Sequence, residues 1–212
     1  MKRICFIMSF LLLGFSFAFS QQLLKPDSLG LKLQKLYLNM HIETGWLNGQ
    51  HVDWRTGKQD DPNATTENTT HCSAFVAAAC DRMGIYILRP PEHEQELLAN
   101  AQYNWLLSAK GKVNGWRQLN KTDYKTAQQY ANQGYMVVAT YKNPNPQRAG
   151  HIVCVMPSEI EQDSLQQNGP FIIQSSRINN SNIKFRTAFH RVIKKQWPAQ
   201  NVLFFYNTKR VK

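Results

Sequence analysis

Residues 70–84 read THCSAFVAAACDRMG, and the spacing of their apolar side chains predicts a buried helix that begins at a cysteine. Counted from Cys72, these side chains recur at i+3, i+4, i+7, i+8 and i+11, the repeat of one helix face. Thr70 is a suitable N-cap and Gly84 a suitable terminator. Cys72 therefore falls in the first turn, where the helix dipole and free N–H groups stabilise a thiolate and can hold an oxyanion.

Cys80 and Cys154 are the other two cysteines after residue 20, and their positions can be compared with that of Cys72. Cys80 lies on the same helix face, about 12 Å further along at ~1.5 Å per residue. A disulfide requires two Cα atoms within ~7 Å, so these two cysteines cannot pair. We expect Cys80 and Cys154 to be core residues, and whether these two form a disulfide is left open. The alternative for Cys72 itself is a small buried hydrophobic residue, the commoner fate of a cysteine.

Helical patterns dominate the first part of the chain and strand patterns the second. Helices are predicted over residues 28–43, 92–109 and 122–133, and a long polar loop over residues 48–71. Short runs rich in Val, Ile and aromatic residues then predict strands at Tyr135–Tyr141, His151–Met156, Phe171–Ser175 and Val202–Tyr206. Helices followed by strands favour an α+β fold with an antiparallel sheet.

One histidine stands at the mouth of a predicted strand. His151 follows Gly150 and shares a strand face with Val153 and Val155. A polar ring at the end of an apolar strand is well placed to act as a base toward a thiol on a neighbouring helix. The alternative is a surface histidine at a turn. The other five histidines do not show the spacing of a zinc-binding motif, so we expect no metal and no cofactor. These histidines are His41, His51, His71, His93 and His190.

Gln174 lies near the end of the next predicted strand. Its side-chain oxygen could accept the Nδ1–H of His151 and so direct the other ring nitrogen at the cysteine sulfur, as the third member of a catalytic triad does. The alternatives are a solvated glutamine, or orientation of the histidine by Ser175 or Asn180.

Five motifs in chain order resemble those of NlpC-type cell-wall peptidases, which are relatives of the CHAP amidases within the papain-like fold. Residues 71–76, HCSAFV, resemble the family's D-C-S-G-F-V core, and residues 84–90, GIYILRP, its glycine and L-P-R stretch. Residues 134–138, GYMVV, resemble the G-D-L-V-F strand. Residues 150–155, GHIVCV, resemble the H-V-G-I-Y strand, and residues 172–175, IIQS, fall where the family has I-H-A.

This resemblance implies a papain-like, NlpC-like fold, with N-terminal helices and a nucleophile-bearing helix packed on an antiparallel sheet. It implies Cys72 as nucleophile, His151 as base and Gln174 as the residue that orients the base. The chain departs from the family pattern at three positions: His71 replaces Asp, Ala74 replaces Gly and Gln174 replaces His. The reaction expected is amide hydrolysis through a thioester.

Three further residues are predicted to contact the substrate. Ser73 can add a hydrogen bond beside the nucleophile, and Trp54 and Trp105 can line a cleft; the alternative for both tryptophans is core packing. The stretch between Met83 and Tyr135 is longer than the family's compact version, and we expect it to carry its own helices.

The expected substrate is a peptide amide of peptidoglycan, with a general exported protease or amidase next. The alternatives are a catalytically inactive cell-wall-binding module of the same fold, or an acyltransferase of the permuted relatives. Those relatives place histidine before cysteine, whereas Cys72 precedes His151 here, which counts against them.

The N-terminus has the three parts of a secretory signal peptide: early positive charge, an apolar run and a small-x-small site. We expect residues 1–20 to be removed, leaving residues 21–212 as a single, secreted or periplasmic, monomeric domain. An N-terminal membrane anchor is the alternative, and no later segment is long and apolar enough to span a bilayer. Loss of Lys2 and Arg3 lowers the formal charge from +11 to +9, which favours a polyanionic partner. Basic residues are scattered, and no nucleic-acid motif occurs.

Overall fold

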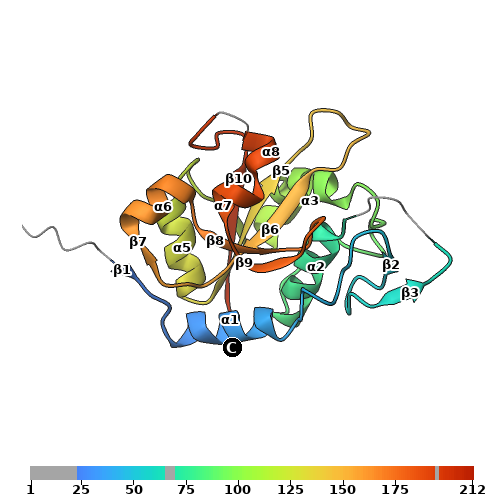
Figure 1. The fold of residues 1–212 in the computed structure, drawn as a ribbon, viewed down its shortest axis with the longest axis horizontal. Coiled ribbons are helices and arrows are strands. Elements are labelled where there is room, and N and C mark those ends of the chain that lie inside the picture. The colour runs from blue at the N-terminus through green and yellow to red at the C-terminus, as the bar shows by residue number, and fades with distance from the viewer. Residues whose placement is uncertain (1–22, 65–69, 194–195) are drawn as a thin grey trace, which may run out of the picture.

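The computed structural model describes residues 23–64, 70–193 and 196–212, and its helices and strands form a mixed α+β fold (Figure 1). The predicted signal peptide, residues 1–20, lies outside the described residues. Within them, no helix is both long enough and apolar enough to cross a membrane.

A six-stranded sheet with antiparallel pairing throughout forms the centre of the fold. Its strands, in spatial order, are β4 (Trp116–Gln118), β10 (Leu203–Arg210), β5 (Tyr135–Tyr141), β6 (His151–Val155), β8 (Phe171–Gln174) and β9 (Asn180–Lys184). The four inner strands confirm the four sequence predictions. The two edge strands were missed because both are short and mostly polar, so neither shows the apolar pattern of a buried strand.

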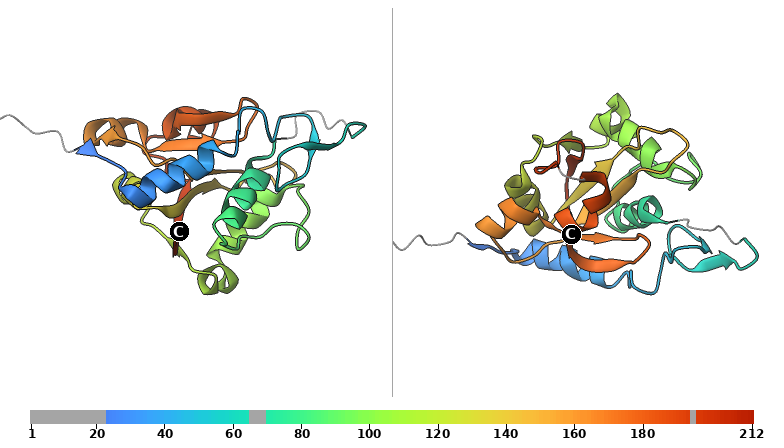
Figure 2. Two further views of the ribbon diagram at one scale, coloured as in Figure 1. Left: turned by 90° about the horizontal axis from the view of Figure 1, so that it is seen from below. Right: turned by 45° about the horizontal axis from the view of Figure 1, so that its top comes forward.

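Alternation along the inner strands gives the sheet two buried faces. On β5, Met136 and Val138 join one apolar cluster, whereas Val137 and Ala139 join another. The first cluster is covered by α1 (Ser28–Leu38), α2 (Cys72–Arg82) and α3 (Leu98–Leu107). The second is covered by α5 (Tyr124–Asn132), α6 (Gln162–Asn168), α7 (Phe185–Ala188) and α8 (His190–Ile193). In both views of Figure 2 the green-blue α2 and the orange α6 lie on opposite sides of the sheet.

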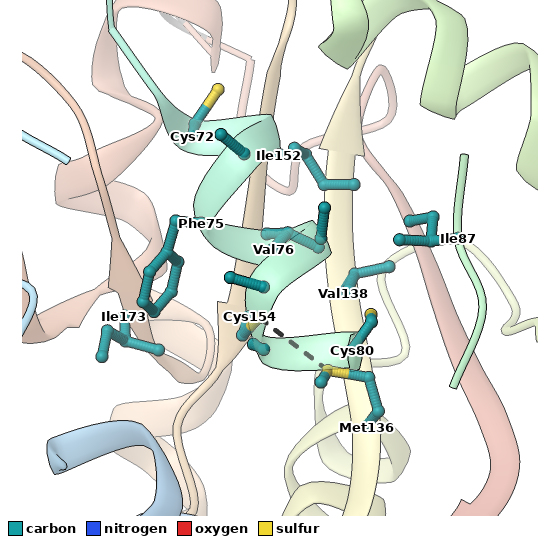
Figure 3. Close-up of a cluster of buried hydrophobic side chains, with 14 of the residues drawn as sticks. Cys72, Phe75, Val76, Cys80, Ile87, Met136, Val138, Ile152, Cys154 and Ile173 are labelled. Atoms are coloured by element: carbon teal, nitrogen blue, oxygen red, sulfur yellow. Dashed lines mark hydrogen bonds between the residues drawn. The ribbon is translucent and has the colours of Figure 1, made fainter. Parts of the chain in front are cut away.

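The α2 helix is buried along most of its length and packs against β6. Phe75, Val76 and Cys80 lie among the strand side chains, whereas Cys72 stands at the start of the helix with its sulfur directed away from the cluster (Figure 3). The helix ends as predicted, since Gly84 adopts a left-handed φ of 63° that favours glycine.

Three predicted segments differ from the structure. The first helix ends at Leu38 rather than at residue 43, because the chain turns there and His41 has a φ of 51°. The helix expected over 92–109 begins only after Leu97, which is also left-handed, and is followed by α4 (Ala109–Val113). The long loop contains a two-stranded hairpin of β2 (His51–Val52) and β3 (Gln59–Asp61), while β1 (Leu23–Leu24) pairs with β7 (Ile160–Glu161).

Close contact between α1 and the end of α5 depends on Gly30. A Cβ atom at this position would lie 2.1 Å from the backbone oxygen of Asn132, which already accepts the N–H of Asp27 at 2.9 Å. We predict that Gly30→Ala forces the helices apart and lowers the free energy of unfolding by about 1–3 kcal/mol. Urea unfolding measures this as a lower midpoint. Gly45→Ala is the control, because its nearest neighbour would lie 3.6 Å away; equal losses in both variants would contradict the contact.

Candidate active site

The first residue of β6 and the last residue of β8 meet through their side chains. Nε2 of His151 lies 2.9 Å from Oε1 of Gln174. The amide oxygen can only accept, so the imidazole proton lies on Nε2 and Nδ1 is the nitrogen free for another partner. The structure thus brings these two residues together as predicted but reverses the ring nitrogens. The sequence expectation that Nδ1 would bond Gln174 was wrong, because the strand geometry presents Nε2 to that side chain.

Cys72 and His151 change each other's protonation. Burial alone raises the pKa of the Cys72 thiol, but the charge of His151, its hydrogen bond and the N–H groups of Ile152 and Ser73 bring that pKa below the ordinary 9.0. Burial alone lowers the pKa of His151, yet Cys72 and then Gln174 raise it above 6.5. Each group therefore favours the charged form of the other, which is the thiolate–imidazolium pair.

A hydrogen-bond chain fixes the orientation of the Gln174 amide. Its Nε2 donates to Oγ of Ser176 at 3.2 Å, and because that hydroxyl gives its own proton to the backbone oxygen of Ile178, the Oε1 of Gln174 must face His151. The backbone N–H of Ser176 in turn donates to Oδ1 of Asn179 at 2.9 Å. Asn179 donates to the backbone oxygens of Ile42 and Gly45 at 2.7 and 2.8 Å, which ties the orienting residue to the loop after α1.

The two alternatives to Gln174 have other partners. The hydroxyl of Ser175 is buried and donates to the backbone oxygen of Trp46 at 2.9 Å. Asn180 lies opposite Gln174 in the sheet register, but its Oδ1 accepts the N–H of Asn182. Of Gln174, Ser175 and Asn180, therefore, Gln174 is the residue whose side chain is hydrogen-bonded to the imidazole of His151.

An aromatic contact that the sequence did not indicate supports the imidazole. The ring of Phe189 lies 5.0 Å from the ring of His151, between centroids, at an angle of 53°. Phe189 follows α7 and packs against Phe185 in the second apolar cluster. Its position limits the rotation of His151 and shields one side of the ring from water.

The start of α2 borders a cleft of about 700 Å³. Cys72 is only 3 % exposed but lines this cleft, together with Ser73 and Trp54. His71 occupies the N-cap position of α2, and its side chain makes no capping hydrogen bond. Thr70 was wrongly predicted to cap it. Trp105 does not line the cleft; it packs in the core against Tyr86, with ring centroids 5.5 Å apart.

Two histidines that sequence reasoning set aside also line the cleft. His71 is buried beside the nucleophile, and its Nε2 donates to the backbone oxygen of Gln50 at 2.7 Å. Burial lowers the pKa of His71, which keeps it neutral. His51 is held by the carboxylate of Asp60 across the β2–β3 hairpin. The residues described hold no group of three or more His, Cys, Asp or Glu arranged for a metal ion.

Cys80 and Cys154 differ from Cys72 in their chemistry. Both are fully buried, and both are free thiols, so the open question of a bridge between them is settled against it in this structure. Burial raises the pKa of Cys154 to about 12 and that of Cys80 well above its ordinary value. The structure confirms both as core residues.

Comparison with known protein families found no matching family model, and comparison with curated proteins found no match. The resemblance noted in the sequence therefore stays a prediction, and the geometry of the cleft carries the functional argument.

Selective alkylation tests the pairing of Cys72 with His151. We predict that iodoacetamide near neutral pH modifies Cys72 before Cys80 or Cys154, because only the Cys72 thiol has a lowered pKa. The rate should reach half of its maximum below pH 9.0. In His151→Ala that midpoint should rise, since burial raises the pKa of the Cys72 thiol and the imidazole that lowers it is then missing. A rise of one pKa unit removes about nine-tenths of the thiolate at neutral pH.

Peptide mass spectrometry identifies the modified residue, and circular dichroism checks that the variant is folded. Equal labelling of all three cysteines in folded protein, or the same pH midpoint in both proteins, would contradict the pairing.

Proposed function

We propose that the chain is a cysteine hydrolase of papain-like fold that cleaves amide bonds through a thioester. One observation carries this proposal: the pKa of a thiol at a helix start is lowered by an imidazole that a buried amide orients, and a cleft opens beside the thiol. The order of helix-borne Cys72, strand-borne His151 and strand-borne Gln174 also fits the resemblance to NlpC-type peptidases.

In the first half of the reaction, His151 takes the thiol proton on Nδ1 and Cys72 attacks the carbonyl carbon of the substrate. The C=O electron pair moves to oxygen, and the free N–H groups at the start of α2 stabilise the resulting oxyanion. When the tetrahedral intermediate collapses, the C–N bond breaks and His151 returns its proton to the leaving amine. The product of this half is a thioester on Cys72.

In the second half, a water molecule enters the place of the departed amine. His151, neutral again, takes a proton from this water as it attacks the thioester carbon. The C–S bond breaks, a carboxylic acid leaves and His151 returns its proton to the Cys72 sulfur, which restores the starting state. Gln174 keeps the imidazole in the required tautomer throughout, and no cofactor takes part.

The proposed substrate is a peptide amide of peptidoglycan. The predicted signal peptide would deliver the protein outside the cytoplasm, and the formal charge of +9 that is left when Lys2 and Arg3 are subtracted from +11 suits a polymer rich in carboxylates. The resemblance of the cysteine motif to wall-cutting enzymes points the same way.

Variants at the three proposed catalytic residues test this function. We predict that Cys72→Ala and His151→Ala lower turnover by about 10³-fold or more, because both groups take part in bond making or proton transfer. Gln174→Ala should lower it less, about 10- to 100-fold, since a neutral side chain only orients the base. Asn180→Ala, opposite Gln174 in the sheet, is the control and should keep full activity.

The assay incubates purified protein with sacculi and identifies new amine and carboxylate ends by mass spectrometry. Ends that form with wild type and not with Cys72→Ala identify the bond. Intact sacculi together with cleavage of an unrelated peptide would refute the wall substrate alone. Binding to sacculi without cleavage of any amide, and an unreactive Cys72, would favour a non-catalytic wall-binding module.

A further inference from the structure

His71 lies between the two walls of the cleft, directly before the nucleophile in the chain. Its ring is buried and lines the cleft together with Cys72. On the hairpin side, Nε2 of the ring lies 2.7 Å from the backbone oxygen of Gln50. On the side of the 94–96 segment, the Gln95 side chain hydrogen-bonds the ring and favours its charged form. Because Gln50 occupies Nε2, Nδ1 is the ring nitrogen that meets Gln95.

Both partners of the ring can only accept hydrogen bonds. The Gln50 partner is a carbonyl oxygen, which has no proton to donate. Gln95 uses its Nε2 to donate to the backbone oxygen of Val52 at 2.8 Å, so its Oε1 faces His71. This oxygen is buried, and no other described group donates to it. Rotation of the amide by a half turn would not remove the conflict, because Oε1 would then face the carbonyl of Val52.

A neutral imidazole cannot satisfy both acceptors, because it carries a single N–H. With the proton on Nε2, Gln50 is satisfied and the lone pair of Nδ1 faces Oε1 of Gln95. With the proton on Nδ1, the lone pair of Nε2 faces the carbonyl of Gln50 at 2.7 Å. The imidazolium donates to both. A buried acceptor without a donor costs free energy, so these contacts favour the uptake of a proton by His71.

The groups around the ring set the pH at which His71 takes up this proton. Burial opposes the charge most strongly and holds the pKa of His71 below 6.5. The charge of His51 and the N-terminal end of α2 act in the same direction, whereas the two acceptors and Asp60 raise the pKa. Cys72 and His151, as an ion pair, add no net charge. We therefore expect His71 to take up the proton in acidic solution rather than at neutral pH.

Charges further along the cleft act on the ring in opposite directions. Glu94 and Glu96 line the cleft and favour a positive charge on the ring. Arg55 and Arg89 share the one carboxylate of Asp81, which leaves a positive charge beside the cleft that disfavours it. Because these effects oppose each other, we expect the acceptors at the ring to have the larger effect on its pKa.

We propose that His71 is a proton switch in the cleft: when protonated in acidic solution, it links Gln50 to Gln95 and places a positive charge beside the nucleophile. This inference concerns the regulation of the proposed active site and rests on Cys72 as its nucleophile. The charged ring adds a second link between the walls to the bond of Gln95 with Val52. Its charge also attracts anionic groups, so a polymer rich in carboxylates should bind the cleft more strongly in mildly acidic solution.

Titration of the His71 ring by NMR tests the donor count, and comparison with His71→Asn assigns the signal. We predict that Gln95→Glu raises the pKa of His71 by about one pKa unit or more, because a carboxylate accepts from the imidazolium more strongly than an amide does. Gln95→Leu should lower this pKa further below 6.5, since Nδ1 then loses its acceptor. Glu92→Gln is the control and should leave the pKa unchanged, because this exposed residue does not line the cleft.

An unchanged pKa of His71 in both folded Gln95 variants would overturn the inference. A wild-type ring that stays neutral down to about pH 4 would overturn it as well. Neither outcome depends on the reactivity of Cys72.

Charged thiol reagents extend the test to the nucleophile. Sulfonatoethyl and methyl methanethiosulfonate share one reactive group, so the ratio of their rates at Cys72 does not depend on the fraction of thiolate. Each rate is divided by the rate with free N-acetylcysteine. We predict that the ratio of anionic to neutral rates rises about three- to tenfold as the pH falls through the midpoint measured for His71, because the new charge attracts the sulfonate.

In His71→Asn that step should be absent, and His71→Gln is the second variant if circular dichroism shows that the first is unfolded. The same step in a folded His71 variant would assign it to other groups of the cleft and overturn the switch, while the nucleophile would stand. Failure of both reagents to label Cys72 would overturn the nucleophile and the switch with it, so the two failures are distinguished.

Discussion

Cys72 and His151 both occupy positions where burial works against charge, and each favours the charged form of the other. Burial raises the pKa of an isolated thiol and lowers that of an isolated imidazole. In this structure the mutual attraction outweighs both effects, so the thiol pKa falls and the imidazole pKa rises. Loss of either side chain would leave the other buried and neutral. Chemistry at the cleft thus depends on the distance and orientation between two elements that are remote in sequence.

The fold provides that placement through its rigid elements. The α2 helix packs along β6, which brings the start of the helix to the strand residue that carries the imidazole. Pairing of β6 with β8 then places Gln174 beside the ring. Ser176 and Asn179 hold the amide, and Phe189 limits rotation of the imidazole. The site therefore rests on a buried helix and two inner strands, with the loop after β8 as support.

Much of this arrangement could be predicted from the sequence because its signals are local. The helical repeat after Cys72 and the apolar runs of the inner strands give element types, and the positions of His151 and Gln174 at strand ends follow from them. Which ring nitrogen meets Gln174 could not be predicted, since a side-chain rotamer depends on tertiary contacts. The edge strand Asn180–Lys184 is polar and has no apolar pattern to read.

The cleft itself was the least predictable part. Its walls come from the hairpin at His51 and the segment at Glu94, two stretches without periodicity whose contact depends on Gln95 bonding Val52. For the same reason the sequence could not distinguish Trp54, which reaches the cleft, from Trp105, which stays in the core.

Titration of the His151 ring by NMR, in wild type and in Cys72→Ala, tests the central claim most directly. Signals of histidine-labelled protein are assigned by comparison with His151→Ala. In wild type, His151 should titrate above its ordinary pKa of 6.5, because Cys72 and Gln174 outweigh burial. In Cys72→Ala the pKa of His151 should fall, because the interactions with Cys72 no longer offset the lowering of this pKa by burial. The same pKa in both proteins would contradict the account, since it would show that Cys72 does not affect the protonation of the His151 imidazole.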